Sequence, residues 1–247
     1  MRQLPLGVRL PDRAVFASFL SARNAEAVEH LQRLARGDRG GAAWVCGPPG
    51  SGKTHLLQAS CVAASESRRA GYLPMRELAS LGVAALEGWP QLDCVALDDL
   101  DAIAGQSEWE RAIFSLYREL EERGGRFIAA SVAPPGLSPW TVPDLRSRLA
   151  ASAVFQLRPL DEAERSEALR LRAHVRGLEL PEDTARWLQR RFPRDMTTLY
   201  ALLDTLDEAA LSAQRRLTVP FIRSVLPPQP PHPSLSPARG GEGAEGG

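Results

Sequence analysis

The sequence predicts an α/β fold, a parallel sheet with helices on both faces, followed by a small all-α domain. Three observations lead to this prediction. Strand-like and helix-like segments alternate about five times between residues 42 and 157, which is typical of a parallel sheet. A glycine-rich loop joins the first of these strands to the helix that follows it. After Pro159 the segments are helical, with no strands between them.

The predicted elements follow from hydrophobic periodicity and from turn residues. Two aromatic residues, Phe16 and Phe19, precede a helix from Asn24 to Ala35, and Gly37 to Gly41 interrupts the chain. Strands are expected at 42–46, 71–74, 92–99, 127–131 and 153–157. Further helices are expected at 55–59, 76–86, 107–122, 143–149, 161–176, 181–191, 195–213 and 219–226. Ser107 and Glu110 fit a capping box at the start of the helix 107–122.

Composition places the chain among ordinary globular proteins. Its 247 residues can form one large or two modest domains, and a hydrophobic content of 44% is enough for a core. The formal net charge is zero, so no overall field recruits nucleic acid. No signal peptide or apolar run of membrane-spanning length is found, and we expect a cytoplasmic protein without membrane contact.

The three cysteines, Cys46, Cys61 and Cys94, lack the spacing of metal ligands. Two of them lie in apolar strand-like runs. We therefore expect small buried side chains in a reducing compartment.

The glycine-rich loop fits the phosphate-binding pattern G-x-x-x-x-G-K-[ST]. It consists of Gly47, Pro48, Pro49, Gly50, Ser51, Gly52, Lys53 and Thr54, and His55 opens the following helix. Glycines let backbone N–H groups turn inward toward an anion, and the helix N-terminus adds a favourable dipole. Lys53 is expected to reach the terminal phosphates and Thr54 to bind Mg²⁺. The alternative is a glycine-rich turn that matches by chance, which the flanking strand and helix disfavour.

Lysine usage supports the same interpretation. Lys53 is the only lysine of the chain, and the other 29 basic residues are arginines. A lysine provides a compact point charge on a flexible side chain, which suits a phosphate ligand.

The apolar strand expected at 92–99 ends in two carboxylates. Ligands of open α/β sheets bind at the carboxyl ends of the strands, so Asp98 is expected to hold Mg²⁺, partly through water, beside Thr54. Asp99 is a candidate for orienting or deprotonating an attacking water. The alternative is a solvated acidic pair that caps the next helix.

The order of these motifs resembles an AAA+ ATPase module, and residues 1–226 resemble the DnaA/Hda family of replication initiators and their regulators. The segments that carry the resemblance are Phe16–Phe19, Cys94–Ala104, Trp109–Tyr117, Pro143–Leu149, Leu178–Asp183 and Ala213–Phe221. It implies four parts: an N-terminal clamp-binding peptide (1–12), a nucleotide-binding domain (13–158), a helical lid (159–226) and a disordered tail (227–247). A DNA-binding domain is not expected after the lid.

The resemblance also implies a mechanism. ADP or ATP with Mg²⁺ would bind between the sheet domain and the lid, and Arg194 is a candidate lid ligand. Arg148 would act in trans as an arginine finger on ATP bound to DnaA, whereas its other interpretation is a surface salt bridge to Asp144. Gln3, Leu4 and Leu6 would bind the sliding clamp of the DNA polymerase, and DNA would be contacted only through the clamp. The location implied is the bacterial nucleoid and replisome, and a homo-oligomer is left open.

Two positions depart from the family pattern. Val132 and Thr197 occupy the places where the family has its polar sensor and its lid arginine. This predicts weak or no intrinsic hydrolysis. Two other functions stay open: a self-contained AAA+ ATPase of the helicase-loader type, and an adaptor that recruits DnaA without using nucleotide.

Overall fold

A computed structural model describes residues 14–37, 40–193, 195–213 and 216–226 of the chain. The predicted clamp-binding peptide (1–12) and the predicted tail (227–247) lie outside these described residues. The chain divides into two compact units, Met1–Glu164 and Arg165–Gly247.

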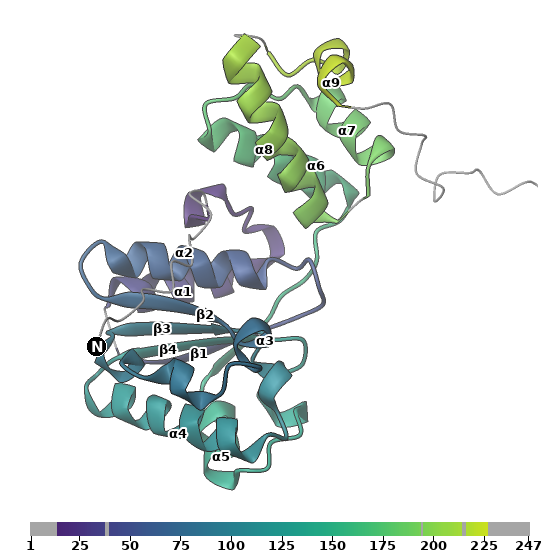
Figure 1. Ribbon diagram of the computed structural model, residues 1–247. Helices are drawn as coiled ribbons and strands as arrows, with labels where there is room; N and C mark the ends of the chain where they lie inside the picture. The colour runs from purple at the N-terminus through teal and green to yellow at the C-terminus, as the bar shows by residue number, and fades with distance from the viewer. Residues whose placement is uncertain (1–13, 38–39, 194, 214–215, 227–247) are drawn as a thin grey trace, which may run out of the picture. The chain divides into compact units, whose positions relative to one another are not determined.

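The first unit is built on a sheet of five parallel strands in the order β2-β3-β4-β1-β5 (Figure 1). The strands are β1 (Gly41–Cys46), β2 (Ala70–Pro74), β3 (Cys94–Asp98), β4 (Arg126–Ser131) and β5 (Ala153–Gln156). Each predicted strand is confirmed, with its ends moved by a few residues. Because the strands are parallel, their carboxyl ends meet at one edge of the sheet, where the phosphate loop lies.

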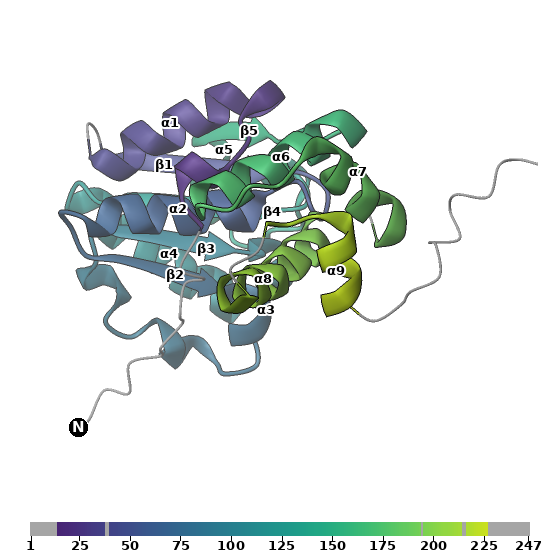
Figure 2. The ribbon, with the colours of Figure 1, turned by 90° about the horizontal axis from the view of Figure 1, so that it is seen from above.

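Helices cover both faces of this sheet (Figures 1 and 2). Helices α1 (Ala25–Arg36) and α2 (Lys53–Ser65) pack on one face, and α4 (Ser107–Glu122) and α5 (Pro143–Ala150) pack on the other. Each face has its own apolar core. Trp44 and Val45, neighbours in β1, belong to different cores because successive side chains of a strand point to opposite faces.

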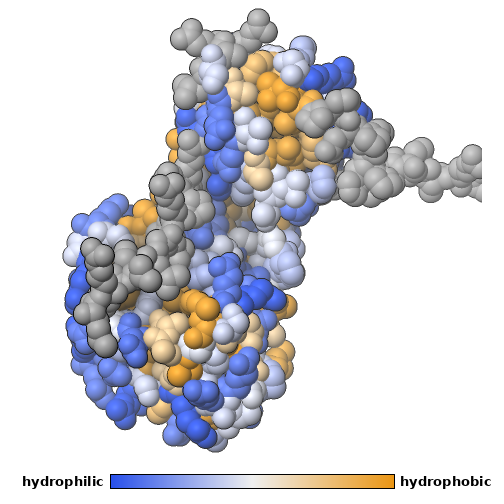
Figure 3. All heavy atoms as spheres, in the orientation of Figure 1, coloured by the Kyte–Doolittle hydropathy of each residue, from blue (hydrophilic) through white to orange (hydrophobic). Residues whose placement is uncertain are grey.

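The segment between β2 and β3 differs from the prediction. The expected helix 76–86 is replaced by the short helix α3 (Met75–Leu78) and the 3-10 helices η3 (Val83–Leu86) and η4 (Trp89–Gln91). Gly82, with φ +79°, interrupts the helical pattern. Figure 3 shows apolar side chains gathered where this segment lies, and a pocket here is lined by residues that include Gly71, Tyr72 and Trp89.

Short 3-10 helices complete the first unit: η1 (Phe16–Ser18), η2 (Ala22–Asn24), η5 (Leu100–Ile103) and η6 (Pro135–Leu137). The capping box predicted at the start of α4 is wrong. Gln106 is the N-cap, and the side chain of Glu110 is turned inward to distant partners, as described below.

The second unit is helical, as predicted. Helix α6 (Glu162–Val175) leads into it, and α7 (Glu182–Arg191), α8 (Met196–Ala213) and α9 (Val219–Val225) follow. Its core is apolar and includes Leu169, Leu188, Leu203 and Ile222. The buried guanidinium of Arg176 is held by ion pairs to Asp204 and Asp207 of α8, which ties α8 to α6.

All three cysteines are buried, and none forms a disulfide. Burial raises the pKa of the Cys94 thiol to about 12 and raises the pKa of Cys61 and Cys46 as well. Within the described parts of the chain, no helix has both the length and the apolar character needed to span a bilayer.

Candidate nucleotide-binding site

The phosphate loop curls between the end of β1 and the start of α2, as the sequence predicts. Gly52 has φ +95°, and a Cβ atom placed there would lie 2.6 Å from Cε2 of Phe19. A Cβ atom on Gly47 would lie 2.9 Å from the carbonyl oxygen of Leu157. Glycine is therefore required at both positions, by backbone conformation and by space.

The single lysine lies inside this loop. Lys53 is only 7% exposed, and its Nζ donates hydrogen bonds to the carbonyl oxygens of Gly47 at 2.7 Å and Pro48 at 3.1 Å. Two neutral carbonyls are weak partners for an ammonium, and a phosphate would bind it more strongly. The buried hydroxyl of Ser51, in the same loop, has no hydrogen-bond partner. An anion in the loop would supply the missing acceptor.

Asp98 meets the loop at the end of β3. This carboxylate is 4% exposed, and its Oδ2 accepts a hydrogen bond of 2.6 Å from the hydroxyl of Thr54. The contact places the two predicted magnesium ligands together. Both provide oxygen, the donor that Mg²⁺ prefers, and two protein ligands suit an ion that keeps waters and binds substrate phosphates. The residues present therefore fit a nucleotide-bound magnesium ion.

A tyrosine that the sequence analysis did not single out also contacts this carboxylate. The hydroxyl of Tyr72 on β2 donates a 2.8 Å hydrogen bond to Oδ2 of Asp98. Burial, and next the negative charge of Asp98, raise the pKa of Tyr72 well above its usual value, so its hydroxyl keeps its proton and remains a donor. A tyrosine in an apolar strand gives no sign of such a role in the sequence.

Asp99, the candidate for orienting water, lies just beyond β3 with φ +49°. Such a left-handed backbone is uncommon for residues other than glycine. Its Oδ2 accepts a hydrogen bond of 3.0 Å from Nε of Arg76, which follows β2. The carboxylate is thus held by a guanidinium that the sequence analysis did not include in the site.

His55 connects the N-terminal aromatic segment to the loop. Its Nε2 lies 3.0 Å from the carbonyl oxygen of Val15 and 3.3 Å from the hydroxyl of Ser18. The ring of Phe19 packs edge-on against His55 at 5.4 Å between centroids. The segment with the two aromatic residues therefore lies beside the loop.

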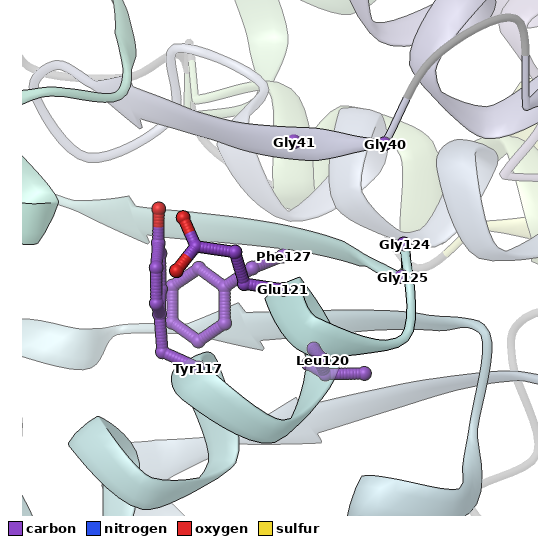
Figure 4. A pocket seen from close by; sticks show the side chains of 8 residues that line it. All are labelled: Gly40, Gly41, Tyr117, Leu120, Glu121, Gly124, Gly125 and Phe127. Carbon is purple, nitrogen blue, oxygen red and sulfur yellow. The ribbon is translucent and has the colours of Figure 1, made fainter.

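Arg148 lies on the surface of α5, in the first unit. Its side chain is 43% exposed, and its guanidinium forms an ion pair with Glu121 of α4. The partner is therefore not Asp144, which the sequence suggested. Figure 4 shows the carboxylate of Glu121 beside the hydroxyl of Tyr117, in a pocket of about 230 Å³ that is also lined by Phe127 and glycines.

Glu110 positions the helix that carries Arg148. It is fully buried, and its Oε2 accepts hydrogen bonds from the backbone N–H groups of Thr141 and Val142 and from the Thr141 hydroxyl, at 2.7–2.9 Å. Its Oε1 accepts a 2.7 Å hydrogen bond from the N–H of Gly105. One carboxylate thus ties the turn after β3 to the start of α5.

The two residues that depart from the family pattern at the sensor positions are both exposed. Val132 follows β4 and is 46% exposed, and Thr197 is exposed on α8. The hydroxyl of Ser131, the polar neighbour of Val132, is buried and bonded to Nε1 of Trp44 and to the carbonyl of Ala133. Arg194 and the clamp-binding residues Gln3, Leu4 and Leu6 lie outside the described residues.

Comparison with known proteins finds a family match for the second unit and similar folds for most of the chain. Residues 161–226 match the family model of the Hda lid domain. Domain III of the replication initiation protein DnaA from Thermotoga maritima is similar with a TM-score of 0.70 and 20% identity, over 87% of this chain and 96% of that one. DnaA from Aquifex aeolicus bound to AMPPCP is similar with a TM-score of 0.66 and 21% identity, over 82% and 67%. The Thermotoga maritima RuvB Holliday junction branch migration motor is more distant, with a TM-score of 0.51 and 16% identity, over 83% and 66%.

A parallel sheet in the order 2-3-4-1-5, a phosphate loop after β1, an aspartate at the end of β3 and a following helical unit define an AAA+ module. Among AAA+ proteins, the match of residues 161–226 to the Hda lid model points to the relatives of DnaA. Residues 161–226 match the lid domain of Hda, and the chain has the fold of the AAA+ domain of DnaA.

Proposed function

We propose that this protein is a regulator of replication initiation, which stimulates hydrolysis of the ATP bound to DnaA. The observation that carries the proposal is the exposed guanidinium of Arg148 on a surface helix, in a chain whose lid matches that of Hda. An arginine supplied by a neighbouring molecule stabilises charge that develops on the transferred phosphoryl group. Such an arginine must be accessible to a partner, as Arg148 is.

The protein's own site would hold ADP or ATP with Mg²⁺. The glycine cradle, the buried Lys53 and the Thr54–Asp98 contact support this, as does the AMPPCP bound to the similar Aquifex aeolicus DnaA. Thr54 and Asp98 would bind the magnesium ion, which neutralises phosphate charge. Val132 and Thr197 at the sensor positions favour a bound nucleotide that is hydrolysed slowly and serves mainly to fix the structure.

The sliding clamp is the second proposed partner. Gln3, Leu4 and Leu6 form the pattern of a clamp-binding peptide, with two apolar side chains for a hydrophobic groove. Through the clamp the protein would reach DNA and work in the cytoplasm, at the replisome.

The direct test is single-turnover hydrolysis of radiolabelled ATP bound to DnaA, in the presence of clamp loaded on DNA. We expect this protein to accelerate hydrolysis, and acceleration should require both DNA and clamp. Hydrolysis at the rate of DnaA alone would refute the proposal.

Clamp binding is tested separately by retention on immobilised clamp. We expect Gln3→Ala to abolish retention of the full chain. Equal retention of Gln3→Ala and wild type would show that this peptide is not the clamp ligand.

A self-contained ATPase remains the second candidate, because Asp98 and Asp99 both lie at the site. It predicts substantial ATP turnover by the protein alone, which Asp98→Asn would abolish. Turnover near the background rate would exclude it.

A further inference from the structure

We propose that Tyr72 is a positioning residue for Asp98, and that its hydroxyl holds this carboxylate in the orientation that binds a magnesium–nucleotide complex. The inference rests on the nucleotide site of the proposed function, and it does not depend on DnaA or the clamp. It concerns a residue of the edge strand β2, outside both the phosphate loop and the strand that carries Asp98.

Both oxygens of Asp98 are held by donors from the protein. Oδ2 accepts from the hydroxyls of Thr54 at 2.6 Å and Tyr72 at 2.8 Å. Oδ1 accepts from the backbone N–H of Asp99 at 3.0 Å. These three donors restrict a carboxylate whose terminal torsion is otherwise broad.

A second polar side chain lies near the hydroxyl of Tyr72. The side chain of Gln58 on α2 is a polar neighbour of this hydroxyl, because it lowers the pKa that burial and Asp98 raise. Gln58 follows Thr54 by one turn of α2, so the helix that holds Asp98 through Thr54 also places a polar side chain near Tyr72. The carboxylate is thus tied to the helix that opens at the phosphate loop.

Packing alone does not require this hydroxyl. The ring of Tyr72 belongs to the apolar core on the α1 and α2 face, where a phenylalanine ring would fill nearly the same volume. The polar end of the side chain meets a charged acceptor, and hydrogen bonds to charged groups are stronger than neutral ones. The Tyr72 hydroxyl therefore fixes the position of Asp98 and, through Asp98, the orientation of the Thr54 hydroxyl.

The test compares Tyr72→Phe with the wild-type chain in the binding of a fluorescent ADP, once with Mg²⁺ and once with EDTA. We expect the variant to lose about three- to tenfold in affinity with Mg²⁺, corresponding to one hydrogen bond. We expect its affinity in EDTA to equal that of the wild type, because the phosphate loop is intact. Tyr117→Phe, which removes a tyrosine hydroxyl on the other face of the sheet, should match the wild type in both conditions.

Three results would overturn the proposal. Equal binding by Tyr72→Phe and wild type with Mg²⁺ would show that the hydroxyl does nothing at the site. Equal losses with Mg²⁺ and EDTA would show a structural role only. A wild-type chain that binds ADP equally well with Mg²⁺ and EDTA would refute the magnesium site itself, and this inference with it.

Gln58→Leu provides the test if Tyr72→Phe does not fold. It removes the polar neighbour of the Tyr72 hydroxyl and leaves the ring in place. We expect a smaller loss of affinity in the same direction, again confined to Mg²⁺. No loss, or one that persists in EDTA, would then overturn the proposal.

Discussion

Among single residues, the glycines of the phosphate loop offer a matched comparison. Gly50 and Gly52 both have positive φ, +76° and +95°. A Cβ atom on Gly50 would meet nothing within 4 Å, whereas one on Gly52 would collide with the ring of Phe19. Backbone strain acts at both positions, and steric overlap acts at one.

We therefore expect Gly50→Ala to lower the free energy of unfolding by about 1 kcal/mol, through strain. Gly52→Ala should lower it by about 1–3 kcal/mol more, because Phe19 must move. Urea unfolding of the two variants measures the difference. Equal losses would mean that Phe19 does not pack on the loop as described.

The cysteines give a second prediction at this scale. Burial raises the pKa of the thiols of Cys46, Cys61 and Cys94, and only a thiolate reacts readily. We expect none of the three to react with an aromatic disulfide reagent at pH 8 in the folded protein, and all three to react in urea. Rapid labelling of any one in the native state would show that it is accessible.

The proximity of Thr54 and Asp98, the two proposed magnesium ligands, could be predicted because each lies in a local pattern that specifies its place. Thr54 ends the phosphate loop, and Asp98 ends an apolar strand. Tyr72 and Arg76 could not be predicted, because their partners, Asp98 and Asp99, lie on another strand of the sheet. A tyrosine within a strand is normally a core residue, and only the pairing of β2 with β3 reveals its contact.

At the scale of elements, α4 shows how a local pattern misleads. Ser107 and Glu110 have the spacing of a capping box, yet the Glu110 carboxylate binds the start of α5, more than thirty residues further along the chain. The sequence fits both interpretations, because a buried glutamate and a capping glutamate have the same local spacing. The helix expected at 76–86 failed for a related reason, since an interior Gly82 adopted positive φ.

The contacts of Glu110 yield a prediction about α5. Replacing Glu110 with alanine leaves four hydrogen-bond donors without their acceptor, three of them at the start of α5. We expect the free energy of unfolding to fall by about 2–4 kcal/mol. Glu108→Ala, an exposed neighbour on the same helix, should change it by less than about 0.5 kcal/mol. Chemical denaturation compares the two, and similar losses would contradict the role assigned to Glu110.

At the scale of the whole molecule, the sequence predicted both units and the place where helices replace strands. The alternation of elements up to residue 157 and its absence afterwards made this possible. Motifs suggested a resemblance to DnaA and Hda, and the match of residues 161–226 to the Hda lid and the DnaA-like fold agree with it. The roles of DnaA and the clamp cannot be derived from one chain, because they depend on surfaces of other molecules.

Nucleotide binding should stabilise the whole chain through the loop. We expect Mg²⁺ and ADP to raise the melting temperature of the wild type, because ligand binding to the folded state shifts the folding equilibrium. Lys53→Ala should lose most of this rise, since it removes the ammonium from the phosphate site. Thermal unfolding with and without nucleotide measures this rise in melting temperature. A rise in Lys53→Ala equal to that of the wild type would show that Lys53 does not bind the nucleotide.

The central claim is that Arg148 acts on ATP held by a neighbouring DnaA. It is tested most directly by comparing Arg148→Ala with Arg146→Ala, an exposed arginine of the same helix, in the single-turnover assay of DnaA-bound ATP. We expect Arg148→Ala to lose stimulation by at least about 100-fold, as when an arginine finger is removed, and Arg146→Ala to keep most of it. Stimulation by Arg148→Ala at the wild-type rate would contradict the account.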